Sequence, residues 1–552
     1  MEWFRQLGRA IRNLARIARQ NPIWAITALT LSPVKLIRHL FGVLILFLIV
    51  GLVLLGGTQF VLHSLMDLPR DSHIYQTVMM LTVVVVILVG LRALFQPLIL
   101  RYGGPDGDAT HGSARFATDA EAKPLAQSAG LLIGRDRKSG KLLRYAGPAH
   151  LLTIAPTRTG KGVGTIIPNL IDYPGSVVCI DPKGENARVT ARQRGRFGAV
   201  HVLDPFGITG QPSAAFNPLD RIDPAGPDLA DDAMTLADAL VYDAPGEAGE
   251  AHWNEEAKAL IAGLILHIVS SEPVGTRTLA TLRDHLTLAP QAFAALLSDM
   301  QGQGGLVARA ANRHLGKSDR EAAGVLSAAQ RHTHFLDSPR MTALLGRSDF
   351  AFADLKASPA SIYLVLPPDR LATYARWLRL MIAQGLTDLA RAPGKTESPV
   401  LFLLDEFAAL GPLDPVERAM GLMAGYGVQL WPILQDVHQL RATYERRAGT
   451  FLSNAGVLQV FGVNDHDSAK LVSDLLGQET VVFETMSRAL DAEESGLSFG
   501  TQHVARPLLT PDEVRAMPAN LELLFLAGQR PIVATKLAYY ADREFAGKFD
   551  PA

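Results

Sequence analysis

Cysteine is almost absent from this chain, since Cys179 is the only one in 552 residues. A single cysteine excludes a disulfide framework and any metal site built from several cysteines. It fits a main body that lies in the cytosol or does not depend on the redox state of its compartment.

Net charge is also nearly absent: 53 Lys and Arg balance 54 Asp and Glu, which leaves −1. The chain as a whole therefore has no basic excess that would indicate nucleic-acid binding, and any basic surface must be local. Hydrophobic residues make up 48% and charged residues 19%, and the mean hydropathy is +0.15. This composition excludes a disordered chain and indicates a membrane segment attached to a globular body.

Charged residues are missing from two long apolar runs near the N-terminus, 40–62 and 74–91. As a helix the first run spans about 34 Å, enough for a hydrocarbon core of about 30 Å. We therefore expect a transmembrane hairpin over 40–100, with helices at about 40–62 and 74–95 and a short periplasmic loop.

The segment 1–39 before this hairpin is basic and predicts the orientation. The positive-inside bias places it, and with it both termini, in the cytoplasm of a multi-pass protein. The spacing of its arginines predicts a basic helix over the first twenty residues, either on anionic lipid or simply solvated. The basic residues are Arg5, Arg9, Arg12, Arg16, Arg19, Lys35 and Arg38, against Glu2 alone.

After residue 101, short apolar runs alternate with helical patterns, which is typical of an α/β fold with a parallel sheet buried on both faces. The expected strands are 150–154, 176–180, 199–203, 361–366, 400–404, 428–434, 457–463 and 523–526. From 217 to 348 the strand signal nearly vanishes, and helices are expected at 228–240, 255–269, 279–286, 290–300 and 320–335. We therefore predict a P-loop nucleotide-binding domain in two parts, 101–219 and 349–552, the latter with C-terminal strands, and an all-α domain, 220–348, inserted between them.

A phosphate-binding loop follows the first expected strand. The order of strand, glycine-containing turn and helix start is the context that a Walker A motif requires. Backbone N–H groups and the positive helix end can hold phosphate oxygens, and Lys161 adds a point charge. The nucleotide-binding candidates are Ala155, Pro156, Thr157, Arg158, Thr159, Gly160, Lys161, Gly162 and Val163.

This loop departs from the usual Walker A pattern at two positions. Ala155 stands where the first glycine is usual, a small loss of backbone freedom. Gly162 stands where a Ser or Thr normally ligates Mg²⁺, so the metal must depend on other groups.

Two aspartates are candidates for the carboxylate that holds Mg²⁺. Asp181 ends the apolar run 176–180, and Asp405 ends 400–404 and is followed by Glu406. ATP hydrolysis needs one carboxylate for the metal and a second that polarises the attacking water. We therefore choose Asp405 as metal ligand and Glu406 as catalytic base, and place Asp181 in a loop beside the nucleotide.

Gln435 ends the next expected strand, 428–434. An amide at that position can contact the γ-phosphate or the attacking water and so respond to the nucleotide state. The alternative is an ordinary polar residue at a strand end.

Several separate motifs together resemble the TraG-type coupling proteins of type IV secretion and conjugation systems. They are APTRTGKGVG at 155–164, DPKGE at 181–185, FNPLD at 216–220, WNEEA at 253–257, LDEF at 404–407, QD at 435–436 with QL at 439–440, ND at 464–465 and RPLL at 506–509. The resemblance covers most of the chain from about residue 40. Glycine at the position of Gly162 occurs in this family, which removes the objection to magnesium.

The resemblance implies a RecA/FtsK-like ATPase anchored in the bacterial inner membrane and assembled as a homohexamer, with ATP and Mg²⁺ as cofactors. It implies that relaxase–DNA complexes or effector proteins are passed to the secretion channel, that the all-α insertion lies at the entry face of the ring, and that DNA, single-stranded, meets the ring channel. Further partners are the inner-membrane components of the secretion system. Arg418 and Arg447 are candidates for an arginine finger.

Two other functions compete with this one. A nucleotide-regulated receptor or assembly scaffold without motor activity would not need a base such as Glu406. A DNA translocase of the FtsK or HerA type shares the ring architecture.

The insertion is acidic rather than basic at its start, where Arg221 is the only Lys or Arg. The acidic residues of this stretch are Asp220, Asp223, Asp228, Asp231, Asp232, Asp238, Asp243, Glu247 and Glu250. Such a surface repels a phosphate backbone, so we expect the insertion to select a protein signal first.

Overall fold

The computed structural model describes residues 2–20, 22–102, 110–242, 251–394, 396–488 and 497–552. It divides into two compact units, Met1–Ala114 with Gly477–Leu508, and Arg115–Leu476 with Leu509–Ala552. The segment 477–508 therefore groups with the N-terminal residues, although the sequence placed it in the second part of the nucleotide-binding domain. The predicted domain boundaries at 101, 220 and 349 stay predictions.

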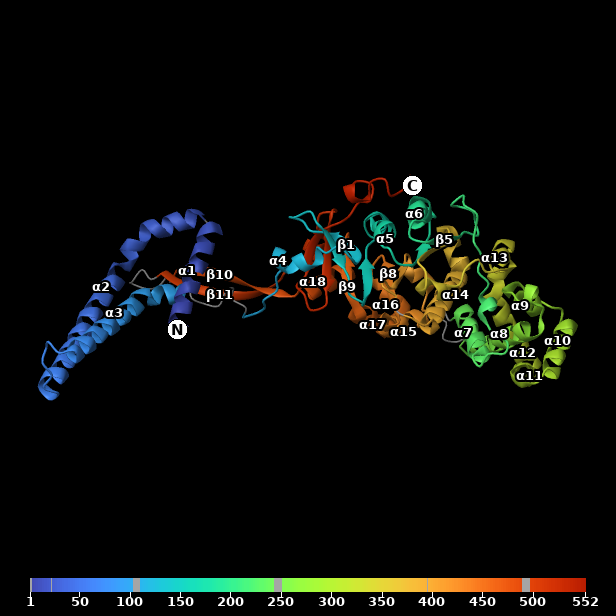
Figure 1. Ribbon diagram of the computed structural model, residues 1–552, viewed down its shortest axis with the longest axis horizontal. Coiled ribbons are helices and arrows are strands. Elements are labelled where there is room, and N and C mark those ends of the chain that lie inside the picture. The colour runs from blue at the N-terminus through green and yellow to red at the C-terminus, as the bar shows by residue number, and fades with distance from the viewer. Residues whose placement is uncertain (1, 21, 103–109, 243–250, 395, 489–496) are drawn as a thin grey trace. The chain divides into compact units, whose positions relative to one another are not determined.

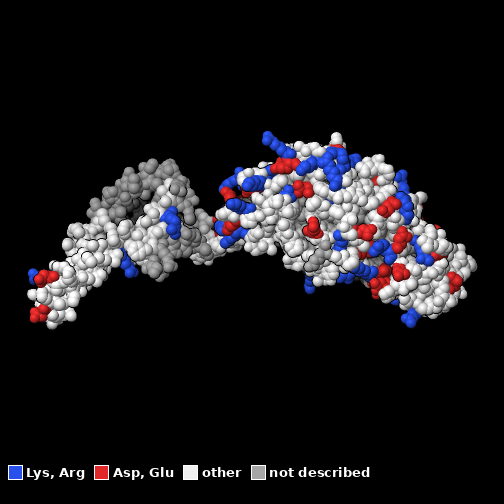
Figure 2. Space-filling model, viewed as in Figure 1, with Lys and Arg blue, Asp and Glu red and all other residues white. Residues whose placement is uncertain are grey.

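The first unit begins with three helices. They are α1 (Glu2–Gln20), α2 (Pro22–Phe60, extended by one π-helical turn, Val61–Leu65) and α3 (His73–Tyr102). Two segments, Leu40–Leu65 and His73–Ile99, are long and apolar enough to cross a membrane. Figure 2 shows a largely uncharged surface along them, with charged atoms gathered where α2 and α3 are joined.

These helices are longer than the expected spans, and the loop between them is correspondingly shorter. The second continues past Arg92 and tolerates Pro97 in its interior. In lipid a helix is favoured beyond the strictly apolar run because the backbone must satisfy its own hydrogen bonds.

The first unit also contains a two-stranded antiparallel ribbon that the sequence did not predict. Strands β10 (Gln478–Arg488) and β11 (Leu497–Pro507) pair from Gln478↔Pro507 to Arg488↔Leu497. Polar residues interrupt both strands throughout, so neither contains the continuous apolar run by which the other strands were found.

The second unit is built on an eleven-stranded mixed sheet in the order β2-β1-β13-β12-β9-β3-β8-β7-β4-β6-β5. From β9 to β5 the neighbouring strands are parallel. The parallel strands are β3 (His150–Ile154), β4 (Val177–Asp181), β5 (Ala199–Leu203), β6 (Ala360–Val365), β7 (Val400–Leu404), β8 (Val428–Leu434) and β9 (Ala455–Val460). The predicted α/β fold is therefore confirmed, with each of these strands at or near its expected place.

Antiparallel strands complete the other end of the sheet. They are β1 (Leu131–Arg135), β2 (Leu142–Tyr145), β12 (Leu521–Leu526) and β13 (Ile532–Thr535). The sequence indicated only β12 among these, because β1 contains a glycine, and β2 and β13 have only four residues each.

Helices cover both faces of the sheet, and Figure 1 shows α5 and α6 on one side and α15 to α17 on the other. The sheet-covering and connecting helices are α4 (Asp119–Ala122), α5 (Ile167–Asp172), α6 (Glu185–Arg194), α14 (Leu371–Arg391), α15 (Asp414–Leu422), α16 (Val437–Tyr444), α17 (Ala448–Asn454), α18 (His466–Leu476) and α19 (Pro511–Arg515). The core between these layers is apolar and includes Ile133, Cys179, Tyr363 and Trp431, all fully buried.

Between β5 and β6 the described residues form helices and connecting loops without a strand. The helices are α7 (Leu229–Leu240), α8 (Ala251–Ser271), α9 (Leu279–Leu286), α10 (Pro290–Gly302), α11 (Gly305–Leu315), α12 (Asp319–Thr333) and α13 (Pro339–Leu344). Helix α8 is the centre of this group, since Ile261, Leu264, Ile265 and Ile268 are fully buried and it contacts α7, α11 and α12. Of the predicted acidic residues, Asp243, Glu247 and Glu250 lie outside the described residues.

Candidate nucleotide site

The phosphate-binding loop lies between the buried strand β3 and a helical segment. The chain leaves β3 at Ile154, turns through 155–161 and enters a π-helical turn, Gly162–Ile166, that continues into α5. Ala155 is fully buried, and its N–H donates to the carbonyl of Leu434 at the end of β8 (2.8 Å). The predicted succession of strand, turn and helix is therefore present.

Two residues of this loop have left-handed backbone conformations. Arg158 has φ of 63° and Gly160 has φ of 93°. The second requires glycine, because a side chain at such an angle strains the backbone. Thr159 Oγ1 donates to the carbonyl of Pro156 (2.6 Å), which holds the turn closed. Thr157 and Arg158 are exposed, while Pro156 and residues 159–163 are partly buried.

Lys161 lies against both predicted acidic residues at the end of β7. Its Nζ is 3.0 Å from Asp405 Oδ1 and 2.5 Å from Glu406 Oε1. The three side chains are only 12–24% exposed. The structure thus brings together residues 245 positions apart in the chain.

Gln435, which follows β8, completes this cluster. Its Nε2 donates to Glu406 Oε2 (2.9 Å), so that one carboxylate oxygen faces Lys161 and the other faces the amide. Glu406 itself has a left-handed backbone, with φ of 51° and ψ of 40°. For a residue other than glycine this costs about 1–3 kcal/mol and is typical of positions where the direction of a side chain matters.

The order of the strands explains why these side chains meet. Strand β8 lies between β3 and β7, and all three are parallel, so their carboxyl ends share one edge of the sheet. Binding sites in open α/β sheets form outside that edge. The phosphate loop, Gln435 and the Asp405–Glu406 pair follow the three neighbouring strands in that spatial order.

Burial and ion pairing shift the pKa values of the three charged groups in different directions. For Lys161, burial opposes the charge, but Asp405 and Glu406 together outweigh it and raise the pKa. Burial raises the pKa of Asp405 despite the neighbouring Lys161. For Glu406, burial is outweighed by Lys161, which lowers the pKa. Glu406 is therefore ionised at neutral pH.

Asp181, the rejected alternative, has a different environment at the end of β4. Its carboxylate accepts hydrogen bonds from the backbone N–H of Ala187 (2.8 Å) and of Lys183 (3.3 Å) at the start of α6. Burial raises its pKa to about 6. These contacts describe a residue that holds the start of a helix.

Lys536, which the sequence analysis did not identify, also supports the loop. It follows β13, and its Nζ donates to the carbonyl of Thr159 (2.6 Å) while lying 4.9 Å from the centre of the Phe461 ring. Burial lowers its pKa. No local motif marks this lysine, because its position depends on strand pairing at the far end of the chain.

A buried polar network lies beneath the loop. Thr153 on β3 and Thr165 in the helical turn both donate to Gln459 Oε1 (2.8 and 3.2 Å), and Trp431 Nε1 donates to Thr153 Oγ1. Gln459 Nε2 in turn donates to Glu522 Oε2 (2.7 Å). Full burial raises the pKa of Glu522 to about 8. The network therefore connects both sides of the phosphate loop to a carboxyl group that is protonated at neutral pH.

Arg418 and Arg447, the candidates for an arginine finger, lie beside a different cavity from the residues of the nucleotide site. Both line a cavity of about 820 Å³ whose lining does not include Lys161 or Glu406. Arg447 Nη1 contacts Asp414 (3.1 Å) and Glu417 (2.8 Å).

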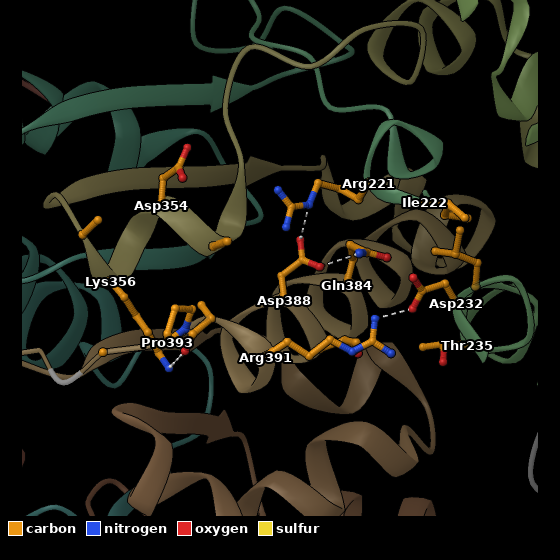
Figure 3. Close-up of a pocket in the computed structure, with 16 residues that line it drawn as sticks. Arg221, Ile222, Asp232, Thr235, Asp354, Lys356, Gln384, Asp388, Arg391 and Pro393 are labelled. Carbon is orange, nitrogen blue, oxygen red and sulfur yellow. Dashed lines mark hydrogen bonds and ion pairs between the residues drawn. The ribbon is translucent and has the colours of Figure 1, made fainter. Parts of the chain in front are cut away.

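A smaller cavity of about 510 Å³ lies beside helix α14 (Figure 3). Figure 3 shows Asp388 between Gln384, which donates to it (2.8 Å), and Arg221 (3.6 Å). Its lining charges are mixed: Arg221, Lys356 and Arg391 with Asp232, Asp354 and Asp388. It has no residue of the phosphate loop in its lining.

Comparison with known proteins gives a consistent result. Residues 115–550 match the family described as type IV secretory system conjugative DNA transfer. A conjugal transfer protein TraG of Escherichia coli is 31% identical over 501 residues, covering 79% of this chain and 78% of that protein. Protein VirD4 of Rhizobium radiobacter is 29% identical, covering 84% and 69%.

Solved structures of the conjugative coupling protein TrwB have the same fold. The structure of TrwB with ADP and Mg²⁺ matches with a TM-score of 0.60 at 17% identity, covering 80% of this chain and 97% of that chain. TrwB with a non-hydrolysable ATP analogue matches with a TM-score of 0.59 at 18% identity, covering 79% and 96%.

Proposed function

Because the chain belongs to the family of type IV secretory system conjugative DNA transfer proteins, we propose that it is the coupling ATPase of such a system. It would receive relaxase–DNA complexes or effector proteins and deliver them to the secretion channel. The observation that supports this most is the meeting of Lys161, Asp405, Glu406 and Gln435 above three neighbouring parallel strands.

The residues present fit ATP with Mg²⁺. Lys161 is paired with two carboxylates in this structure. With nucleotide bound, Lys161 would exchange these carboxylates for phosphate oxygens, and Asp405 would exchange Lys161 for the metal ion. Residues 155–163 would hold the phosphates through their backbone N–H groups. Asp405 would bind the metal, since Gly162 offers no hydroxyl. The metal would neutralise charge on the transferred phosphoryl group.

Glu406 and Gln435 would prepare the attacking water. Glu406 is ionised and its direction is fixed from two sides, by Lys161 and by Gln435. Once Lys161 turns to the phosphates, Glu406 Oε1 becomes available to accept a proton from water, while Gln435 keeps the other oxygen in place. Lys161 would then stabilise the negative charge that develops on the phosphate. These roles make the protein an ATPase rather than a passive nucleotide-dependent scaffold.

We further propose that the protein is a multi-pass inner-membrane homohexamer with both termini in the cytoplasm. The segments Leu40–Leu65 and His73–Ile99 would be its anchor. The basic segment 1–39 before them favours the cytoplasmic side. In a ring of six subunits a neighbouring arginine, Arg418 or Arg447, would complete each site, and single-stranded DNA would pass through the channel.

The helical insertion, 220–348, would be the part that selects the cargo. Several of its acidic residues are engaged internally: Asp232 pairs with Arg391, Asp238 lies 3.5 Å from Lys258, and Asp220 accepts from Ser348 (2.7 Å). Asp223, Asp228 and Asp231 are exposed. In Figure 2 both signs of charge are intermixed over the visible face of the second unit. A mixed surface of this kind suits a protein signal better than naked DNA.

The decisive experiment replaces Lys161 by methionine in the source bacterium and measures transfer of DNA or effector. Methionine keeps the length of the side chain but removes the ammonium. We expect transfer to be lost while the protein remains in the membrane fraction at its normal amount. The matched control is Lys258→Met, a lysine of the insertion that is also paired with two acidic residues. Normal transfer by the Lys161 variant would contradict the proposed function.

A further inference from the structure

Three side chains of metal-binding type meet inside the helical insertion, away from the residues of the nucleotide site. They are His267 on α8, Glu272 just after that helix and His285 on α9. Their candidate ligand atoms all lie within 4.8 Å of one another. Among the residues described by the structure, no other set of three His, Cys, Asp or Glu meets this condition.

The geometry around His285 indicates that a partner for its ring is missing. Its Nε2 is buried without a hydrogen bond, and Glu272 Oε1 lies 3.5 Å away. Leaving a buried polar atom unsatisfied costs about 1–3 kcal/mol. Two ligand atoms of a tetrahedral zinc ion are separated by about 3.4 Å, given bonds of about 2.0–2.1 Å. The pair is therefore spaced as two ligands of one ion would be.

His267 is held in place by a second layer of side chains. It is buried, and its Nδ1 contacts the amide of Gln303, whose Oε1 also accepts from Ser271 (2.8 Å) and whose Nε2 donates to Asp299 (3.1 Å). Gln303 Nε2 lies 2.9 Å and Gln303 Oε1 3.2 Å from Nδ1, so the amide serves either tautomer of the ring. In the tautomer with the proton on Nδ1, that nitrogen donates to Gln303 Oε1 and Nε2 is left for an ion. Metal-binding histidines are usually oriented in this way by their other nitrogen.

Glu272 has a comparable support. Thr276 Oγ1 donates to its Oε2 (3.3 Å), while its Oε1 is the oxygen near His285. One oxygen is thus used by the protein and the other faces the cluster.

We propose that His267, Glu272 and His285 bind one transition-metal ion, with zinc as the expected metal and water as the fourth ligand. Two imidazoles and one carboxylate favour zinc over Mg²⁺ or Ca²⁺, which prefer oxygen ligands alone. The ion would fix the connection between α8 and α9, and this role goes beyond ATP hydrolysis and cargo transfer.

The test uses the full-length protein in detergent, without a histidine tag, stripped with a chelator and then given zinc. Zinc retained after desalting is measured by elemental analysis, and affinity by competition with a chromophoric chelator. We expect about one tightly bound zinc per chain, as for a structural site. Glu272→Gln and His285→Ala should lower the affinity for zinc at least tenfold, and Gln303→Ala should lower the affinity for zinc about 10- to 100-fold.

The matched control is His334→Ala. His334 lies in the same insertion with its Nε2 3.7 Å from Asp337, so it forms a similar histidine–carboxylate pair but belongs to no group of three. Zinc retention should be unchanged in this variant. Circular dichroism and gel filtration show whether each variant is folded, and Glu272→Gln, a conservative change at a partly exposed residue, is the variant least affected by misfolding. The proposal is wrong if folded wild type retains no zinc, or if folded Glu272→Gln and His285→Ala bind zinc as wild type does.

Discussion

Glutamine at position 406 would keep the shape of the side chain but remove the charge that lies 2.5 Å from Lys161 Nζ. Both groups are mostly buried, at 24% and 13% exposed, so solvent screens the pair little. A hydrogen bond to a charged group contributes about 1.5–3 kcal/mol. Asp405 still holds Lys161 at 3.0 Å, and glutamine can still accept a weaker hydrogen bond, so only part of this energy is released.

We therefore expect Glu406→Gln to bind ATP about tenfold more tightly, because each 1.4 kcal/mol corresponds to a factor of ten. Its hydrolysis rate should fall about 10²- to 10⁴-fold, the range for loss of a general base. Lys161→Met should show the opposite pattern in binding, with ATP affinity lost. The two substitutions thus separate competition for Lys161 from catalysis.

Both quantities can be measured on the detergent-purified full chain, binding by titration with a fluorescent non-hydrolysable analogue and turnover by phosphate release. The control is Glu256→Gln, which changes another ion-paired glutamate, 2.8 Å from Arg313 and 14% exposed, in the helical insertion. It should leave both values as in wild type. Full turnover in Glu406→Gln, or ATP affinity reduced rather than raised, would refute the assignment of Glu406.

Three further changes test the surroundings of the site. Because the pKa of Glu522 is about 8 in the folded protein, the folded state holds its proton more tightly, and stability falls as pH rises from about 4.5 to 8. Glu522→Gln should remove this loss, so its thermal unfolding midpoint should exceed that of wild type at pH 8.5 but not at pH 5. If variant and wild type unfold at the same temperature at both pH values, the raised pKa of Glu522 does not affect stability. Gly160→Ala places a side chain at φ of 93° and should weaken ATP binding several-fold through about 1–2 kcal/mol of backbone strain, whereas Gly140→Ala, with φ of 69° on a surface turn, should not. Lys536→Met removes the hydrogen bond to Thr159 and should raise the KM for ATP several-fold with kcat little changed, and an unchanged KM would show that the loop does not need this support.

The parts of the fold that the sequence predicted are those with a local cause. Strands β3, β7 and β8 are nearly continuous apolar runs because both of their faces are buried. Asp405 and Gln435, the polar residues that follow β7 and β8, therefore lie at the edge of the sheet. The same reasoning fails for β10 and β11, whose sequences contain no long apolar run. It also fails for Lys536, since its place beside Thr159 depends on the pairing of β12 with β13 and of β12 with β9.

The choice between Asp181 and Asp405 shows where local reasoning ends. Both follow buried strands, and both strands are parallel, so sequence alone places the two carboxylates at the same edge. Strand order separates them: β7 is the second strand from β3, and β4 is the third. At about 4.8 Å per strand, these positions lie about 10 Å and 14 Å from the strand that carries the phosphate loop. A lysine side chain that starts above β3 and extends about 6 Å toward the neighbouring strands leaves about 4 Å to the strand of Asp405, which the aspartate side chain and a hydrogen bond close, but about 8 Å to the strand of Asp181, which they do not. Asp181, beyond that reach, instead accepts backbone N–H groups at the start of α6, and burial raises its pKa even though these hydrogen bonds and Arg188 oppose the rise.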